Sequence, residues 1–381
     1  MPPQVLAVVS GLVALAALTG GDRPVRGQPP EVPPRALDFI RQSEDKTHFV
    51  REGTNERIVM WGFNYDHDDT GRLLEDYWGD EWATVAEDFR EMKSLGANVV
   101  RVHLQLARFM TDAERPNEVN LARLARLVRL AVKTGLYLDV TGLGCYHKQD
   151  VPGWYDGLGE SARWGVQARF WKAVAGVCKD SPAIFCYDLM NEPILTGGDG
   201  KDDWLPGKPL GGKHYVQRIT RDARGRTDKA IARAWVERLT TAIREVDDRH
   251  MITVGVIPWA QVFKGAQPLF ESPEVGGPLD FASVHFYPKA GDLNGSLAAL
   301  KVYEVGKPLV IEEIFPLGAG LEETEAFIER SRAHVDGWMS FYWGKSIEEY
   351  EKEGDLKGAL DGGWLRRFRA RSPYWRGEGK E

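Results

Sequence analysis

The sequence lacks several features that would assign it to a simple class of protein. Only three of its 381 residues are cysteine. An odd number of cysteines excludes a fully paired disulfide framework, and their spacing matches no zinc-binding motif. No basic excess is present, since 49 Lys and Arg against 56 Asp and Glu give a net charge of −7. Binding to nucleic acid needs a basic surface and is therefore not expected.

Long hydrophobic runs are also missing. The apolar stretch over residues 5–18 is too short to span a bilayer, so stable membrane insertion is not expected. With small residues at 16–20 it is typical of a secretory signal, although no Lys or Arg precedes it. We expect a secreted or periplasmic protein with a signal over 1–20, a Pro-rich linker over 21–45 and one domain over 46–381. The sequence does not indicate an oligomeric state.

Two predicted strands end in acidic residues. One apolar run leads directly into Asn191 and Glu192, and a second, far away in the sequence, leads into Glu312 and Glu313. Runs of β-formers without polar alternation are typical of strands buried on both faces. Strands that present glutamates at the same end suit a parallel barrel, whose active site lies at the carboxyl ends of its strands.

The rest of the sequence supports this α/β fold class. Apolar runs alternate with amphipathic helices, which predicts a (β/α)8 TIM barrel; an open, doubly wound sheet is the alternative. A β-hairpin over 48–61 precedes the barrel, and a long loop over 195–227 follows the fourth strand as a cleft wall or lid. The first predicted barrel strand ends at 62–65. The others cover 98–104, 136–141, 184–193, 251–256, 281–286, 309–313 and 338–343. The predicted helices cover 81–95, 120–134 (capped by Asn120), 161–178, 228–246, 296–303 and 322–333.

Two carboxyl groups close together at one end of a barrel are the minimum set of side chains needed to cleave a glycosidic bond. One carboxylic acid protonates the leaving oxygen, while the other, ionised group attacks the anomeric carbon. The nearest fixed cation decides which group stays ionised. Arg101 is the candidate, because an arginine inside an apolar strand must be paired or solvated.

These motifs resemble glycoside hydrolase family 5 of clan A. The resemblance is carried by Asn191-Glu192-Pro193 and by Lys307-Pro308 ahead of Glu313. It implies a secreted retaining β-glycoside hydrolase that needs no cofactor or metal and acts on an oligo- or polysaccharide. On the family's pattern Glu313 is the nucleophile, Glu192 the acid/base and Arg101 the cation beside the nucleophile. Strand alternation alone does not choose between Glu312 and Glu313.

The resemblance implies further substrate-binding residues. Asn191 would donate to the sugar 2-hydroxyl, and Trp343 would form the floor of the cleavage subsite. His285 and Tyr287 match the family's His–X–Tyr pair. Possible sugar platforms in the loops are Trp154 and Trp204. The family's histidine at the end of the third strand is replaced by Thr141, and we expect His147 either to take its role or to leave it vacant.

Several alternatives stay open. An endo-β-1,4-glucanase-like activity is favoured, with a β-mannanase or an exo-acting β-glycosidase as the alternative. From other classes, a barrel metallohydrolase would use His103, Asp139, Glu192 and His285 as ligands, and a non-catalytic barrel would only bind carbohydrate. A disulfide between Cys178 and Cys186 is a further possibility in an exported protein.

Overall fold

The computed structural model describes residues 36–196 and 203–378. The predicted signal segment and the first part of the predicted linker lie outside these residues. A small antiparallel sheet comes first, in the order β1 (Ile40–Gln42), β2 (Phe49–Arg51) and β3 (Arg57–Ile58). The predicted hairpin is therefore confirmed as β2 and β3. Strand β1 was not predicted, and it places ordered structure inside the stretch expected to be a linker.

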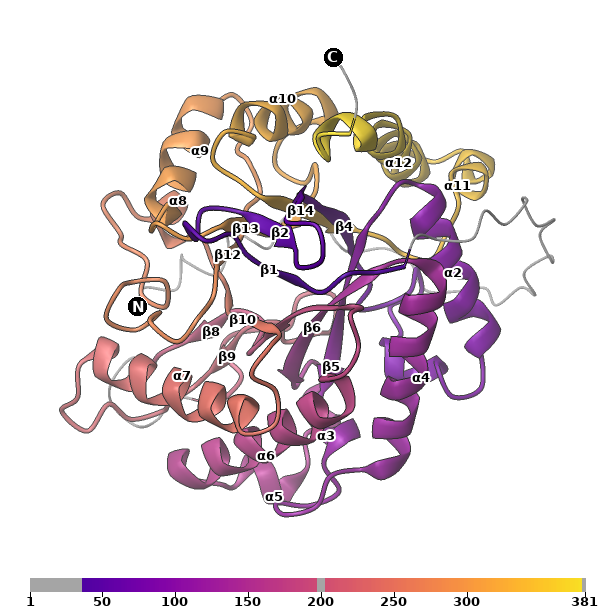
Figure 1. The fold of residues 1–381 in the computed structure, drawn as a ribbon. Coiled ribbons are helices and arrows are strands. Elements are labelled where there is room, and N and C mark those ends of the chain that lie inside the picture. The colour runs from indigo at the N-terminus through magenta and orange to yellow at the C-terminus, as the bar shows by residue number, and fades with distance from the viewer. Residues whose placement is uncertain (1–35, 197–202, 379–381) are drawn as a thin grey trace.

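The main sheet is a closed parallel barrel (Figure 1). Every pairing within it is parallel, and the last strand, β14, pairs with the first, β4. The fifth strand is divided at Val254 into β10, which pairs with β7, and β11, which pairs with β12, so the ring is complete. This confirms the (β/α)8 prediction. The strands are β4 (Met60–Asn64), β5 (Val99–Gln105), β6 (Tyr137–Gly144), β7 (Ile184–Asp188), β10 (Met251–Thr253), β11 (Gly255–Val256), β12 (Ala282–His285), β13 (Leu309–Ile314) and β14 (Gly337–Phe341).

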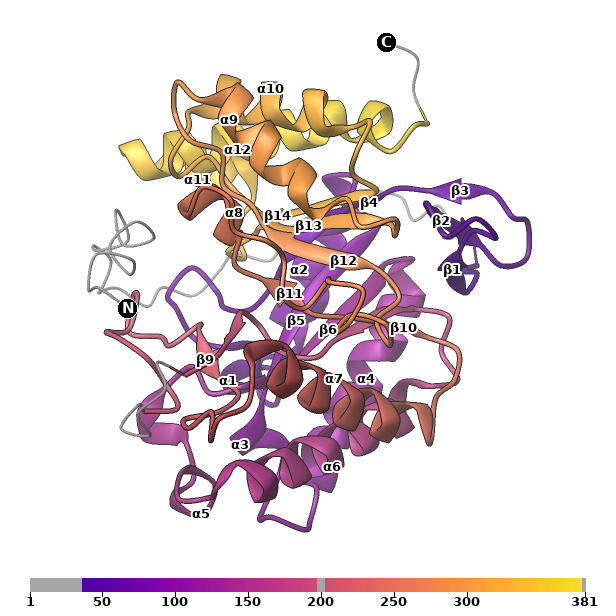
Figure 2. The ribbon, with the colours of Figure 1, turned by 90° about the vertical axis from the view of Figure 1, so that its left-hand side faces the viewer.

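Helices surround these strands and alternate with them along the chain (Figures 1 and 2). The main outer helices are α2 (Trp82–Ser94), α4 (Glu118–Thr134), α6 (Glu160–Cys178), α7 (Asp228–Arg244), α9 (Leu293–Leu300), α10 (Leu321–Ser331) and α12 (Leu356–Trp375). The shorter ones are α1 (Leu74–Tyr77), α3 (Leu106–Phe109), η1 (Lys148–Asp150), α5 (Gly153–Asp156), α8 (Trp259–Val262), η2 (Lys301–Tyr303) and α11 (Ile347–Glu353). Within the described residues, no helix is long and apolar enough to cross a membrane.

Helix α4 begins one turn earlier than predicted. The side chain of Asn117 accepts hydrogen bonds from the backbone N–H groups of Val119 and Asn120, which makes Asn117 the N-cap. Asn120, the predicted cap, is buried and donates to the carbonyl of Arg108 instead. The predicted end is correct, because Gly135 adopts a left-handed conformation with φ of 67°.

The N-terminal sheet closes one end of the barrel. Phe49 of β2 is fully buried and makes edge-to-face contacts with Phe185 and Phe281, at ring-centroid distances of 5.1 and 5.2 Å. Both partners lie at the start of barrel strands, so this plug covers the amino ends. In Figure 2 the strands β1–β3 and the loop strand β9 (Gln217–Arg218) lie at opposite sides of the molecule. The carboxyl ends are thereby left for the functional site.

The predicted long loop is anchored to the carboxyl ends of the barrel strands. A short strand after β7, β8 (Pro193–Ile194), pairs in parallel with β9. The backbone N–H of His214 donates to the carbonyl of Tyr146 at 2.8 Å, and Gln217 donates to the carbonyl of Leu143 at 2.9 Å. The described part of this loop therefore forms one wall beside the strand ends. The three cysteines are buried free thiols, so the disulfide considered for Cys178 and Cys186 is not formed.

A close approach between β4 and β5 generates a prediction about stability. A Cβ on Gly62 would collide with the carbonyl and side chain of Val99, neither of which has room to move. We expect Gly62→Ala to lower the free energy of unfolding by about 1–3 kcal/mol or more. Gly176, exposed in α6, has no atom in the way and is the matched control. There the change to alanine should be neutral or stabilise by up to about 1 kcal/mol. Urea unfolding followed by circular dichroism measures both, and equal stability of the two variants would contradict the packing argument.

Candidate active site

The carboxyl ends of the barrel strands bring together a set of polar side chains, all buried except the partly exposed Glu192 and Tyr287. They are Asn64 from β4, Arg101 and His103 from β5, Asp139 and Thr141 from β6, Asp188 with Asn191 and Glu192 from β7 and the turn after it, His285 and Tyr287 from β12 and its extension, and Glu312 and Glu313 from β13. The predicted Arg101, Asn191, Glu192, His285, Tyr287 and Glu313 all lie in this group. Sequence reasoning missed Asn64 and Asp188, although each is a polar residue at the end of a predicted strand.

An irregularity in β13 turns both of its glutamates into the barrel. Val284 of β12 pairs with Ile311 of β13. The next residue of β12, His285, pairs with Glu313, so Glu312 is an extra residue with no direct partner. A β-bulge of this kind breaks the alternation of side chains along a strand. Glu312 is consequently 0% exposed and Glu313 only 8% exposed, both toward the interior.

Arg101 is the central cation of the site. It is fully buried, and its two terminal nitrogens each make two hydrogen bonds to side chains from other strands. One nitrogen donates to Glu313 at 2.9 Å and to Asn64 at 3.0 Å, and the other donates to Asp188 at 2.7 Å and to Asn191 at 3.0 Å. The predicted pairing of Arg101 with Glu313 is therefore present in the structure.

Glu192 and Glu313 face each other with His285 between them. Each of these three residues offers a ligand-type atom within 4.8 Å of the others. The Nδ1 atom of His285 lies 3.0 Å from Glu192 Oε1 and 3.4 Å from Glu313 Oε1. A separation of about 5–5.5 Å between carboxyl groups is typical of retaining glycosidases, whereas inverting enzymes need room for a water molecule. The spacing here suits direct attack by one carboxylate.

The backbone at Glu192 is strained. Its φ of 47° lies in the left-handed region, which a glutamate seldom adopts. The conformation is held because the Glu192 N–H donates to the carbonyl of Gly255 at 2.9 Å. Strain of this kind is common where a side chain must be aimed at a reacting atom.

The two glutamates differ in their surroundings. Burial and the nearby Glu192 raise the pKa of Glu313 above its usual value, although His285, Arg101 and the hydroxyl of Tyr287 each favour its ionised form. Tyr287 donates to Glu313 Oε2 at 2.8 Å, so both oxygens of Glu313 accept a hydrogen bond. The side chain of Glu192 is 15% exposed and contacts His285. Glu313 thus accepts hydrogen bonds from a cation and a hydroxyl, whereas the hydrogen bond of Glu192 is to His285.

Trp343 follows β14, at the carboxyl end of the last barrel strand. Its indole N–H lies 3.0 Å from the Nε2 atom of His67, and its ring stacks on Phe341 and meets Phe315 edge to face. The Nδ1 atom of His67 is in turn 2.9 Å from the buried Asp66. The predicted floor residue is therefore fixed in orientation by the segment after β4, and it remains only partly buried.

At the end of the third barrel strand, Thr141 occupies the position of the family's histidine, and His147 does not fold back to it. Thr141 is buried and donates to Asp188 at 2.9 Å. Tyr146, a residue that sequence reasoning missed, reaches the site: its hydroxyl contacts His103 and its ring packs on Tyr215. His147 is only half-buried and lies beside the exposed loop, so Tyr146 and not His147 is the side chain that this segment directs inward.

The two predicted loop tryptophans have different environments. Trp154, in α5, is partly buried and packs edge to face on Tyr155. Trp204 is only 1% exposed, and the guanidinium groups of Arg163 and Arg221 lie 4.3 and 4.7 Å from its ring centre. A sugar platform needs an open ring face, so the prediction for Trp204 is wrong in this structure. Its role is to pack the loop.

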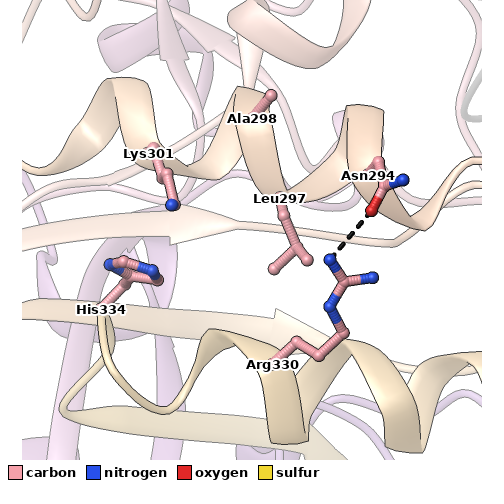
Figure 3. Close-up of a pocket in the computed structure, with 6 residues that line it drawn as sticks. All are labelled: Asn294, Leu297, Ala298, Lys301, Arg330 and His334. Carbon is pink, nitrogen blue, oxygen red and sulfur yellow. Dashed lines mark hydrogen bonds between the residues drawn. The ribbon is translucent and has the colours of Figure 1, made fainter.

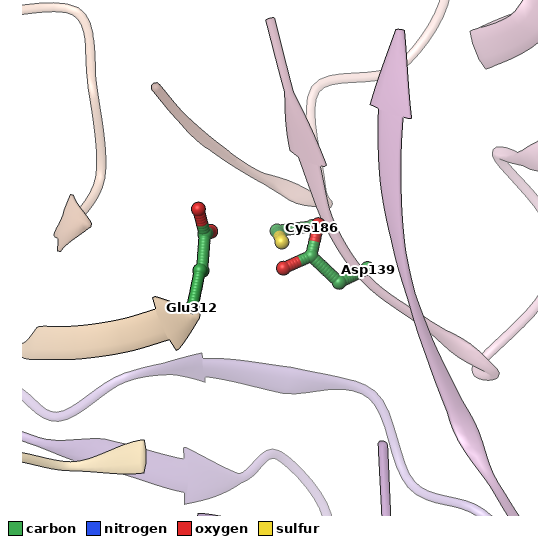
Figure 4. A group of neighbouring side chains, drawn as sticks. All are labelled: Asp139, Cys186 and Glu312. Atoms are coloured by element: carbon green, nitrogen blue, oxygen red, sulfur yellow. The ribbon is translucent and has the colours of Figure 1, made fainter. Parts of the chain in front are cut away.

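The ligand set considered for a metallohydrolase is divided between separate places. His103 pairs with the Tyr146 hydroxyl, and Glu192 and His285 belong to the group that contains Glu313. Asp139 lies deeper, where it faces Cys186 and Glu312 (Figure 4). Burial and Glu312 raise the pKa of Asp139 well above its usual range and so favour its neutral form.

A separate hollow lies in the outer helical layer between α9 and α10 (Figure 3). It has a volume of about 260 Å³ and is lined by Asn294, Leu297, Ala298, Lys301, Arg330 and His334. Arg330 donates to Asn294 at 2.9 Å, and His334 lies 2.6 Å from Glu304. Two of its three basic groups are thus engaged by the protein, and the barrel separates the hollow from the site.

Comparison with solved structures finds the same fold in several glycosidases. The exo-β-1,4-mannosidase Op5Man5 from Opitutaceae bacterium strain TAV5 is 17% identical with a TM-score of 0.65, and the match covers 88% of this chain and 62% of that one. The endo-1,4-β-mannanase from Rhizomucor miehei is 15% identical with a TM-score of 0.58, covering 88% of this chain and 100% of the other. The catalytic domain of the Thermobifida fusca endoglucanase Cel5A is 16% identical with a TM-score of 0.56, covering 87% and 96%.

At these identities the likeness concerns the fold alone. A sequence comparison with curated proteins finds no match. The family model described as cellulase (glycosyl hydrolase family 5) matches residues 54–344. This span begins just before β3 and ends just after Trp343, so it contains the whole barrel and every residue of the site. The chain therefore belongs to glycoside hydrolase family 5 and is a retaining β-glycosidase.

Proposed function

We propose that this enzyme hydrolyses β-1,4-linked mannosides, with Glu313 as the nucleophile and Glu192 as the acid/base. The observation that carries the assignment is the asymmetry between two facing carboxylates. Arg101 and Tyr287 each donate a hydrogen bond to Glu313, whereas the hydrogen-bonding neighbour of Glu192 is His285. Hydrogen bonds from a cation and a hydroxyl stabilise a carboxylate, which is the form that attacks.

The reaction proceeds in two steps. In the first, Glu313 attacks the anomeric carbon while Glu192 gives its proton to the leaving oxygen, and a glycosyl ester forms. In the second, Glu192 takes a proton from water, the water attacks the same carbon and the ester to Glu313 breaks. Arg101 and Tyr287 hold the carboxylate that leaves. Asn191 has its oxygen fixed by Arg101 and one amide N–H bonded to the carbonyl of Tyr215, so its other amide N–H is the one that would donate to a substrate hydroxyl.

The choice of a mannoside rests on the relatives. Both an exo-β-1,4-mannosidase and an endo-1,4-β-mannanase share this fold, the former with a TM-score of 0.65. A β-1,4-glucan is the second candidate, favoured by the endoglucanase among the relatives and by the cellulase description of the family model. The two glycans differ only in the orientation of the 2-hydroxyl, which is the group that we assign to Asn191.

We also propose that the enzyme is exported. The proposal rests on the apolar run over residues 5–18, which lies outside the described part of the chain. Polymeric substrates of this class are too large to enter a cell, which agrees with an exported hydrolase.

The first test of the proposed function concerns the substrate. On a panel of β-1,4-mannan, mannobiose, β-1,4-glucan, cellobiose and aryl β-glycosides, we expect the highest kcat/KM on the mannosides. Release of reducing sugar, with separation of the products by length, measures this and distinguishes exo from endo cleavage. A preference for the glucans would transfer the proposal to the second candidate, and inactivity on the whole panel would contradict both.

The second prediction separates the two glutamates. Glu192→Gln and Glu313→Gln should each lose at least about 10³-fold in kcat on a glycan. With a dinitrophenyl glycoside, whose leaving group needs no proton, Glu192→Gln should still form the ester and show a burst of phenol, whereas Glu313→Gln should not. Glu75→Gln, a buried carboxylate of α1, is the control and should retain activity. A burst from Glu313→Gln would reject the nucleophile assignment.

The third prediction uses the Tyr287 hydroxyl. Its hydrogen bond lowers the pKa of Glu313, so its loss in Tyr287→Phe should raise that pKa. Because Glu313 attacks only when it is ionised, the acidic limb of the kcat/KM profile should move to higher pH, by about one unit.

The matched control is Tyr187→Phe. The hydroxyl of Tyr187 is also buried and donates to a carboxylate, that of Asp247, at 2.6 Å, but away from the site. Its removal should destabilise the fold without moving the acidic limb. An unmoved limb in Tyr287→Phe, or a shift to lower pH, would contradict the proposed role of the hydroxyl.

A further inference from the structure

Glu312, the glutamate that precedes the nucleophile in β13, takes no part in the two-step reaction. It nevertheless lies close to His285 and Arg101, which contact the reacting glutamates. Glu312 is the extra residue of the bulge and is 0% exposed. Its Oε2 atom lies 3.7 Å from the Nε2 atom of His285 and 3.8 Å from Arg101. Within the described residues, neither oxygen of Glu312 has a hydrogen-bond partner at normal distance, and the Nε2 atom of His285 has none either. A buried carboxylate and a buried imidazole nitrogen therefore lie next to each other beside Arg101, with Asp139 and Cys186 on the other side of the carboxylate.

We propose that Glu312 is a positioning residue that holds His285 in its doubly protonated form between the two catalytic glutamates. The Nε2–H group of His285 is directed at Glu312, and the Nδ1–H group is directed at Glu192 and Glu313. The inference rests on the proposed function only for the roles of those two glutamates, and the geometry around the imidazole stands independently of the substrate.

The charges around His285 support this arrangement. The groups that face His285 are Arg101 and His103 of β5, Glu192 after β7, and Glu312 and Glu313 of β13. Two further acidic groups, Asp139 of β6 and Asp188 of β7, lie near Glu312. Burial and Arg101 lower the pKa of His103 well below its usual range, which favours its neutral form. Arg101 is then the sole fixed cation of this described cluster, and the carboxyl groups of Asp188, Glu312 and Glu313 all lie close to it. A proton on His285 supplies a second positive charge among these acidic groups.

The direction of the pKa shift agrees with the geometry. Burial lowers the pKa of His285, but Glu313, Glu192 and Glu312 outweigh it and raise this pKa to about 10. Burial likewise opposes ionisation of Glu312, and Arg101 and His285 reverse this, so its pKa is lowered. Asp139, with Cys186 and Glu312 as its neighbours in Figure 4, is the carboxyl group that stays neutral.

The backbone opposite this pair leaves no room for a side chain. A Cβ on Gly255 would lie 2.5 Å from Glu312 Oε2, 2.6 Å from His285 Nε2 and 3.1 Å from Arg101. The three groups thus converge on one point against the backbone of β11. Only glycine permits the approach, which indicates that the juxtaposition of Glu312 and His285 is built into the barrel.

A fixed imidazolium has a consequence for the reaction. While Glu313 is ionised, the positive charge of His285 balances it. Once Glu313 has become a neutral ester and Glu192 has given up its proton, the same charge faces the new carboxylate of Glu192. His285 keeps both its protons through these steps, and Glu312 is the counter-charge that makes this favourable.

The test measures the protonation of His285 directly. The chain has eight histidines, so selective ¹⁵N-histidine labelling gives a tractable NMR spectrum, and His285→Gln assigns the signals of His285. In the wild type both ring nitrogens should be protonated at pH 7. In Glu312→Gln the imidazolium should lose its proton at a pH lower by about 1–3 units, because an opposite charge has been removed. Glu75→Gln removes another buried carboxylate and should leave the titration unchanged.

Two results would overturn the proposal: a neutral His285 at pH 7 in the wild type, or an identical titration in Glu312→Gln. Glu312→Asp serves if Glu312→Gln does not fold. It retains the charge but withdraws it from the imidazole, so a smaller fall in the pKa of His285 is expected and an unchanged titration would again reject the role. No substrate is used, so inactivity on mannosides would contradict the proposed function and leave this test valid.

Discussion

The buried guanidinium of Arg101 is the constraint on which the site depends. It binds side chains from β4, β7, the turn after β7, and β13, and so fixes the relative positions of strands far apart in sequence. Burying a charge is costly unless it is paired, and loss of one partner of such a pair usually costs about 3–5 kcal/mol. The acidic groups around Arg101 are therefore as much a requirement of the fold as of the chemistry, and the nucleophile is one member of that set.

The barrel separates this polar end from an apolar one. At the amino ends, Phe49, Phe185 and Phe281 fill the interior, while the carboxyl ends contain Arg101 and its partners. The described part of the loop after β7 and the segment after β4 add walls to the polar end: Tyr215 accepts a hydrogen bond from Asn191, and His67 orients Trp343. Charged groups in this enclosure act on each other more strongly than they would in water.

The barrel and most of the site follow from the sequence because they depend on local patterns. Apolar runs that end in Asn191-Glu192 and in Glu312-Glu313 predict strands that deliver carboxylates, and Arg101 stands out as a charge within an apolar run. What the sequence does not reveal depends on contacts between distant segments. The bulge that points both glutamates inward is visible only in the pairing of β12 with β13.

The failures have the same origin. Trp204 looks like an exposed loop residue until Arg163 and Arg221 are found on its ring. Tyr146 carries no motif, and its part in the site arises from its contact with His103.

The apolar plug also bears on the order in which the chain folds. Phe49 belongs to one of the first ordered strands, but its partners Phe185 and Phe281 are reached only after much of the chain has been made. During synthesis the surface on which the N-terminal sheet docks stays incomplete until β12 has emerged, and the Phe49 ring is not fully covered in the meantime. Contacts this distant in sequence form slowly, because a long loop must close, at a cost in entropy, before the contacts can stabilise the fold. Docking of β1–β3 is therefore expected to be among the last steps of folding, and a nascent chain that stops before β12 keeps this aromatic surface open to other proteins.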